Sequence, residues 1–104
     1  MVEITFVPEK LSLSFHGHAD YAEKGKDIVC SAVSTLFYTL VSSLEEMGCE
    51  LDVKAEEGDS YVECVAMPPI RGHVMQTYWT ILVGLQMLAE QYPENICFNV
   101  ENEG

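Results

Sequence analysis

The sequence has 104 residues, 48% of them hydrophobic, which suffices for one core and excludes a disordered chain. Seventeen acidic and five basic residues give a formal net charge of −12, which disfavours binding to nucleic acid or to an anionic membrane. The charge favours cationic partners, or it serves solubility alone. We expect one cytoplasmic domain over residues 1–104, because the N-terminus lacks a signal peptide and no apolar run is long enough to cross a bilayer.

Alternating apolar and polar residues predict two strands at residues 2–6 and 11–16, joined as a hairpin. The second strand carries polar residues on the face that we expect to meet solvent: Ser12, Ser14 and His16. His18 shares that face if the extended geometry continues through Gly17. The first two strands therefore lead directly to a histidine.

A polar segment without a periodic face, residues 19–26, follows and predicts a mobile loop that closes on a ligand. Asp27 then has the character of a helix N-cap, since its carboxylate can accept hydrogen bonds from the first backbone N–H groups. From residue 28 to about residue 47, apolar residues recur at spacings of three and four. This pattern predicts a largely buried helix that stops at Gly48.

A second helix is predicted over residues 74–92, before Pro93. It is apolar on most sides because three large residues extend its core face: Trp79, Val83 and Met87. Such a helix is either deeply buried or part of an oligomer interface. Gly84 in its middle costs roughly 1 kcal/mol relative to alanine, which indicates close approach to another backbone.

Three further strands are predicted at residues 50–55, 61–65 and 96–100. The order β-β-α-β-β-α-β with alternating strands predicts an α+β domain, in which two helices pack on one face of a mostly antiparallel sheet.

The four cysteines are expected to be free thiols, because no CxxC pair suggests a zinc site or a redox dithiol. Cys30 differs from the others because it is the third residue of the predicted helix, where N–H groups and the helix dipole favour a thiolate. That effect supplies only roughly 0.3–1 kcal/mol, so the thiolate needs help from a base such as His18. The pair, with free helix N–H groups beside a forming oxyanion, is the minimal apparatus of a cysteine protease.

Other interpretations of these residues remain open. Cys30 can be a packed core residue, since free cysteine is among the most buried residue types. Asp27 can orient the histidine or only cap the helix. His16 and His18 on one strand face could bind a metal, although no further ligand stands at a recognisable spacing. From the residues alone, three functions therefore remain open: a cysteine protease, a non-catalytic binding module and, more remotely, a metal enzyme.

Two segments resemble the signature of the Prp family of ribosomal processing cysteine proteases. They are Gly17-His18-Ala19 and Gly25-Lys26-Asp27-Ile28-Val29-Cys30-Ser31-Ala32-Val33-Ser34. The resemblance extends over the whole chain in length and element order, and it includes an ending of the second helix, Ala89-Glu90-Gln91-Tyr92-Pro93. Ser31 departs from the alanine that is common in the family.

The resemblance implies that Cys30 is the nucleophile and His18 the proton acceptor, with Asp27 at a position characteristic of the motif. It implies a homodimer with a flexible loop over the active site, and we expect neither a cofactor nor a metal. Its substrate would be the precursor of large-subunit ribosomal protein number twenty-seven, cut between an apolar, aromatic extension and a lysine-rich segment. We therefore predict a cytoplasmic cysteine endopeptidase, and as the alternative a non-catalytic acidic binding module for a basic ribosomal protein.

Overall fold

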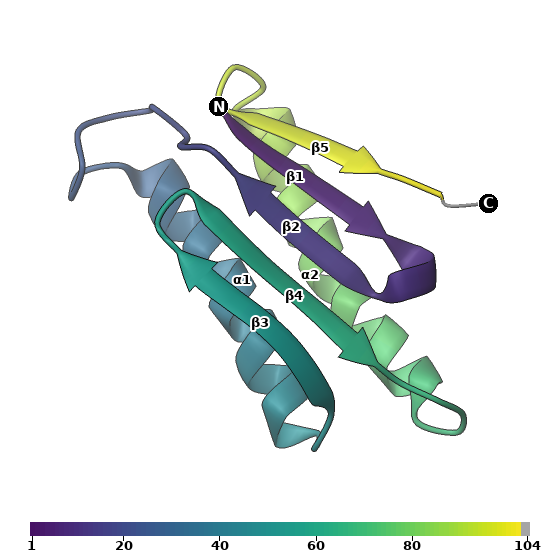
Figure 1. Ribbon diagram of the computed structural model, residues 1–104. Helices are drawn as coiled ribbons and strands as arrows, with labels where there is room; N and C mark the ends of the chain where they lie inside the picture. The colour runs from purple at the N-terminus through teal and green to yellow at the C-terminus, as the bar shows by residue number, and fades with distance from the viewer. Residues whose placement is uncertain (103–104) are drawn as a thin grey trace.

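The computed structural model describes residues 1–102 and has two layers, a five-stranded sheet and two helices on one of its faces (Figure 1). The elements in chain order are β1 (Val2–Val7), a 3-10 turn (Pro8–Lys10), β2 (Ser12–His16), α1 (Ile28–Glu46), β3 (Glu50–Glu56), β4 (Asp59–Val65), α2 (Arg71–Gln91) and β5 (Ile96–Val100). The strand order is β3-β4-β2-β1-β5, and among the strand pairs within residues 1–102 only β1–β5 is parallel. The predicted α+β class and element order are confirmed.

The core lies between the sheet and the helices, and its composition follows from the periodicity of each element. Alternate residues of β1 are buried, as a strand with one covered face requires, and β2 buries Leu13 and Phe15 on the same side of the sheet. α1 buries one stripe of residues at helical spacing: Val29, Val33, Phe37, Leu40, Val41 and Leu44. Burying each such side chain contributes about 1.5–3 kcal/mol, so these contacts supply much of the stability of the domain.

α1 corrects one prediction about membranes. Its 19 residues are long and apolar enough to cross a bilayer by length and composition, with a mean hydropathy of 1.5, although no such run was predicted. The polar residues of α1 are serine and threonine for most of its length, and these lower the hydropathy only slightly. In the structure one face of this helix packs into the core of the domain. A helix in the core of a globular domain can have the same length and hydropathy as a membrane span.

One prediction about exposure is wrong. Ser12, expected on the solvent-facing side, is buried with 5% of its surface exposed, because β2 is a central strand that pairs with β1 and β4. Val53 is 41% exposed. It belongs to β3, an edge strand that pairs only with β4. An alternating pattern predicts which residues share a face but not how completely that face is covered.

Gly84 lies where α2 packs against α1, but the expectation of a backbone contact is wrong. A Cβ atom at position 84 would lie 3.2 Å from Cδ1 of Leu36, a side-chain atom of α1. The glycine therefore makes room for a leucine side chain between the helices.

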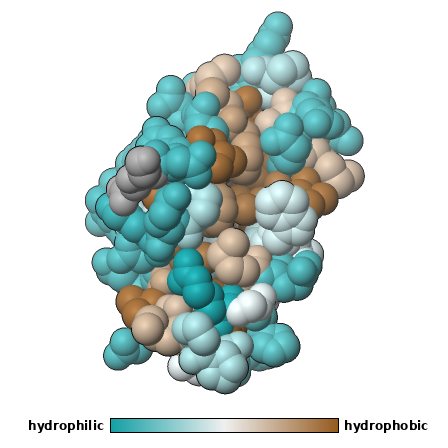
Figure 2. Space-filling view, turned by 90° about the vertical axis from the view of Figure 1, so that its right-hand side faces the viewer, coloured by the Kyte–Doolittle hydropathy of each residue, from teal (hydrophilic) through white to brown (hydrophobic). Residues whose placement is uncertain are grey.

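The outer face of α2 remains uncovered in the single chain. Trp79, Val83 and Met87 are 60%, 47% and 57% exposed, and their four-residue spacing places them on one side of the helix. On the side of the molecule that Figure 2 shows, hydrophobic side chains gather between hydrophilic margins. The prediction that α2 is buried is thus confirmed for one face only, through Val74, Tyr78 and Leu85.

Tyr78 connects α2 to the turn between β1 and β2. Its hydroxyl donates a 2.6 Å hydrogen bond to the carbonyl oxygen of Leu11, and both residues are fully buried. The same oxygen also accepts the N–H of Cys64. Burial raises the pKa of Tyr78 far above its ordinary value, so the hydroxyl remains a donor.

Tyr78→Phe should lower the free energy of unfolding by about 1 kcal/mol, because Leu11 keeps one donor and loses the other. For a domain of this size the melting temperature should fall by about 4–8 °C. Tyr38→Phe is the matched control, since Tyr38 is 54% exposed. Equal melting temperatures for the Tyr78 variant and the wild type would contradict the structural role of this bond.

Candidate active site

Cys30 lies in the first turn of α1, as predicted. Asp27 is the N-cap, and its Oδ1 accepts hydrogen bonds from the N–H groups of Val29 at 3.0 Å and Cys30 at 2.9 Å. Cys30 is therefore the third helical residue, at the end of the helix where the dipole favours negative charge. Its side chain is half-buried.

Asp27 also holds the loop that precedes the helix. Its Oδ2 accepts the N–H groups of Tyr21 at 3.0 Å and Ala22 at 3.4 Å, so one carboxylate binds four backbone donors. Burial opposes ionisation of Asp27, but hydrogen bonds from the Cys30, Tyr21 and Ala22 N–H groups and from the Cys30 side chain outweigh it and hold the pKa of Asp27 below its ordinary value. Asp27 thus acts as a cap and a loop anchor, and among the described residues its carboxylate accepts no hydrogen bond from His18.

The capping bonds correct the prediction of free helix N–H groups beside the cysteine. The Val29 and Cys30 N–H groups already donate to the Asp27 side chain, and the Ser31 N–H donates to the Asp27 carbonyl. In the first turn, only the N–H of Ile28 has no acceptor among the described residues. A backbone amide cannot serve fully both as a cap donor and as an oxyanion donor, so the first turn offers fewer oxyanion donors than the sequence suggested.

His18 is placed by a turn at the end of β2. The strand stops at His16, and Gly17 has φ +96°, so the extended geometry does not continue to His18 as the shared-face prediction required. The Gly17 N–H donates to the carbonyl oxygen of Gly58 at 2.9 Å. His18 itself is exposed, with its ring against Gly58 in the turn between β3 and β4.

His18 and Cys30 line the same cleft, which has a volume of about 610 Å³. The cleft lies between the loop 17–27, the first turns of α1 and the β3–β4 turn, and its lining is partly apolar, including Phe15 and Phe37 in edge-to-face contact with ring centroids 5.3 Å apart. Its acidic lining residues are Asp20, Asp27, Glu56, Glu57 and Asp59. The site therefore combines a thiol, an imidazole, an apolar wall and an acidic margin.

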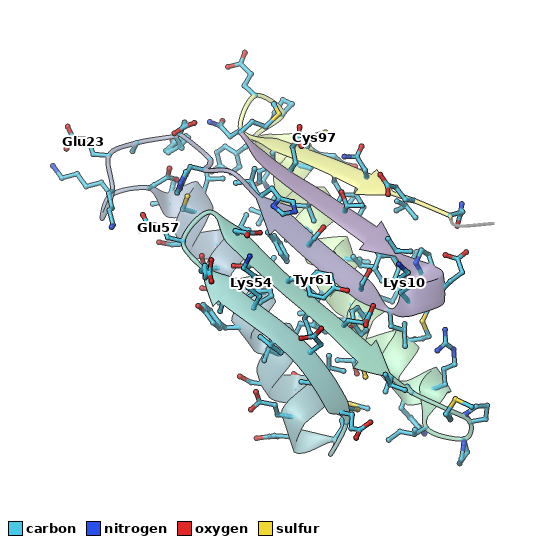
Figure 3. The ribbon with its side chains drawn as sticks, in the orientation of Figure 1. Lys10, Glu23, Lys54, Glu57, Tyr61 and Cys97 are labelled. Carbon is cyan, nitrogen blue, oxygen red and sulfur yellow. The ribbon has the colours of Figure 1, made fainter. Side chains whose placement is uncertain are left out.

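The loop predicted over residues 19–26 is present and is attached at several points. The side-chain amide of Asn95 donates to the carbonyl of Ala19 at 2.8 Å, and Tyr21 and Tyr92 meet edge to face. Lys24 reaches the carboxylate of Glu57 across the cleft at 3.3 Å. In Figure 3 Glu57 lies at the end of the β3–β4 hairpin, close to the loop that carries Glu23.

The remaining cysteines do not share the position of Cys30. Cys64 is 3% exposed, and burial, with a contribution from Cys49, raises the pKa of its thiol to about 11, which makes it a poor nucleophile. Cys49 packs against the core. Within residues 1–102, Cys30 alone among the cysteines lines the cleft.

The metal alternative finds no support in the geometry of the described residues, where no group of three or more His, Cys, Asp or Glu side chains is placed to hold a metal ion. His16 instead pairs through Nδ1 with Oδ1 of Asp59 at 3.0 Å.

A cysteine at a helix start and a histidine line one cleft, and these are the two side-chain types from which a cysteine protease builds its nucleophile and base. Residues 1–97 match the family model described as "Cysteine protease Prp". The chain is 33% identical over 86 residues to the "Ribosomal processing cysteine protease Prp" of Mycoplasma genitalium, covering 83% of this chain and 84% of that one. It is 30% identical over 84 residues to the protein of the same name from Staphylococcus aureus, covering 80% and 79%.

Comparison of the fold with solved structures also finds Prp proteases. A crystal structure of the S. aureus Prp protease in complex with a covalently linked product peptide has a TM-score of 0.85 and 26% identity, covering 97% of this chain and 100% of that chain. By fold and sequence this chain is one of the cysteine proteases, which are hydrolases. It belongs to the Prp family, as the sequence signature indicated.

The sequence-based prediction missed the contribution of the β3–β4 turn. Glu57, Gly58 and Asp59 all line the cleft, and Gly58 touches His18. The only local signal was a Glu-Gly-Asp turn between two strands, which predicts a hairpin but does not predict that its tip lies beside His18. The tip lies there because His16 of β2 pairs with Asp59 of β4, a contact between residues far apart in the sequence.

Asp27→Asn should lower the free energy of unfolding by about 1–2 kcal/mol at neutral pH, because asparagine keeps one oxygen for the helix but presents an NH₂ group to the loop amides. The folded-state pKa of Asp27 lies below its ordinary value of 3.8. Its stabilising effect is therefore complete above that value and is lost as the pH falls through the folded-state pKa.

Urea unfolding of the two proteins from about pH 6 to about pH 3 measures this difference, which should shrink towards acid pH. Asp52→Asn is the control, because Asp52 lies exposed on the edge strand and caps no helix. A difference between Asp27→Asn and wild type that stays constant over this range would contradict the anchoring role.

Proposed function

We propose that this protein is a cytoplasmic endopeptidase that removes the N-terminal extension from the precursor of large-subunit ribosomal protein number twenty-seven, using Cys30 as nucleophile and His18 as proton acceptor. The observation that carries the proposal is the shared cleft of these two side chains, with Cys30 at the start of α1. Membership of the Prp family supports it, since the relatives are named as ribosomal processing proteases. The family signature contributes the substrate.

The proposed reaction begins when the imidazole of His18 takes the thiol proton of Cys30. The sulfur attacks the scissile carbonyl, and the carbonyl oxygen becomes an oxyanion. His18 then donates its proton to the leaving amine as the C–N bond breaks, leaving a thioester on Cys30. Water attacks the thioester with His18 again as base, which releases the new carboxyl terminus and restores the thiol.

The charges around Cys30 explain why the proposed reaction needs a histidine. The start of a helix favours negative charge, but the Asp27 carboxylate that accepts the Cys30 N–H at 2.9 Å is itself negative and would repel a negative sulfur. A protonated His18 supplies the positive charge that offsets this repulsion. The thiolate is thus expected to form as a pair with the imidazolium.

The shape and charge of the site suit a basic peptide. The open surface of α1 that adjoins the cleft shares Ser34 and Tyr38 with it, and an extended chain that leaves the cleft on this side would lie along the helix. The carboxylates at the cleft and the net charge of −12 favour a substrate that carries lysines.

The test is cleavage of a peptide that spans the junction between the aromatic extension and the lysine-rich segment, followed by mass spectrometry. Cys30→Ala should abolish cleavage, and His18→Ala should slow it by at least about a hundredfold, because each removes an essential step. Cys97→Ala and His73→Ala are the matched controls, since neither residue lines the cleft.

Full cleavage by the Cys30 variant would reject the dyad. If the wild type binds the peptide with no cleavage, the alternative of an acidic binding module for a basic ribosomal protein holds instead.

The homodimer is also part of the proposal, and the exposed stripe of α2 is the surface that supports it. Large apolar residues at four-residue spacing on one helix are the usual composition of the centre of an interface. Val83→Glu should convert a dimer into a monomer in sedimentation analysis, because it buries a charge without a partner. Val65→Glu is the control, at a valine that is 64% exposed on β4. An identical sedimentation coefficient for Val83→Glu and wild type would exclude this interface.

A further inference from the structure

Gly58 lies against the imidazole ring of His18. A Cβ atom at position 58 would be 2.8 Å from Nε2 of His18, closer than real Cβ atoms approach a neighbour, and 3.1 Å from Cε1. The carbonyl oxygen of Gly58 accepts the N–H of Gly17 at 2.9 Å. One residue of the β3–β4 turn therefore touches the ring of the histidine and also fixes the backbone just before it.

The residues on either side of Gly58 hold the same segment. Asp59 pairs with Nδ1 of His16 at 3.0 Å, two residues before His18. Glu57 pairs at 3.3 Å with Lys24, which follows His18 by six residues. Both ion pairs are exposed and weak, so they align the turn with the segment rather than hold it rigidly. The backbone hydrogen bond and the contact with the ring are the closer constraints.

The backbone angle of Gly58 does not by itself require glycine. Its φ of +73° lies in the left-handed region, which asparagine and aspartate also enter at low cost. The space is more restrictive, because every other residue adds a Cβ where the His18 ring lies, and the ring must then move. The effect of the backbone angle and the effect of the space beside the ring can be separated by experiment.

We propose that Gly58 is a positioning residue for His18: its missing side chain leaves the space in which the imidazole rests, and its carbonyl fixes the approach of the chain. The inference rests on the proposed function, because it matters for catalysis only if His18 moves the proton of Cys30. The ring is the far end of a flexible side chain, so a Cβ would displace it with little cost to folding. A displacement of about 1 Å is enough to lower a rate by about a hundredfold.

The experiment compares Gly58→Ala and Gly58→Asn with Gly48→Ala. Gly48 has φ +77° and open space around its Cβ position, so the control carries the same backbone strain without a neighbour to displace. Melting temperature, peptide cleavage and the His18 ring resonances in NMR spectra are measured for each protein. His18→Gln assigns those resonances among the three histidines.

We expect both alanine variants to lose similar stability, while kcat/KM falls by about 10–100-fold in the two Gly58 variants alone, mainly through kcat. The His18 resonances should shift in those two variants and stay unchanged in Gly48→Ala. Gly58→Asn suits the left-handed backbone, so it remains folded even where alanine does not.

Unshifted His18 resonances with wild-type kcat/KM in folded Gly58→Asn would overturn the proposal. If the wild type itself does not cleave the peptide, the proposed function fails, and the resonances still decide whether Gly58 positions the ring.

Discussion

The buried carboxylate of Asp27 joins the two parts of the chain on which the site depends. Two of its hydrogen bonds close the start of α1, and the other two hold the loop amides of Tyr21 and Ala22. Burying a charge is costly unless donors surround it, and four backbone N–H groups meet that condition. The same bonds set the position of Cys30 and use up amides that would otherwise be available for a substrate oxyanion. Capping and catalysis therefore compete for the first turn of this helix.

The two proposed catalytic side chains are positioned by different parts of the fold. Cys30 belongs to the helix, whereas His18 is held from the opposite side by the β3–β4 turn through Gly17 and Gly58. They share a cleft because β4 pairs with β2 in the sheet, with Asp59 opposite His16. The sheet order, which depends on contacts far apart in the sequence, thus creates the site.

Periodicity and capping rules predicted the local structure well. The spacing of apolar residues gave α1 and its buried face, and the position of Asp27 gave the cap, because both depend on neighbours within a few residues. The family signature directed attention to Cys30 and His18, and the structure places both at one cleft.

What could not be predicted depends on neighbours distant in sequence. Gly84 faces a leucine side chain instead of a backbone, and Ser12 is buried beside Tyr61. The role of Gly58 was invisible for the same reason, since a turn glycine gives no sign of the side chain that packs on it. The occupied amides of Val29 and Cys30 are different: the cap prediction already implied them, because a cap satisfies the donors that an oxyanion would need.

The central claim is that His18 and Cys30 act on one another. The most direct measurement is the rate of iodoacetamide labelling of Cys30 against pH, read by mass spectrometry of the Cys30 peptide, in wild type and His18→Gln. If the pair exists, Cys30 in the wild type should react at least about tenfold faster near neutral pH than in the variant, since a paired imidazolium stabilises the thiolate by about 1.4 kcal/mol or more. Identical rate profiles in the two proteins would contradict the account.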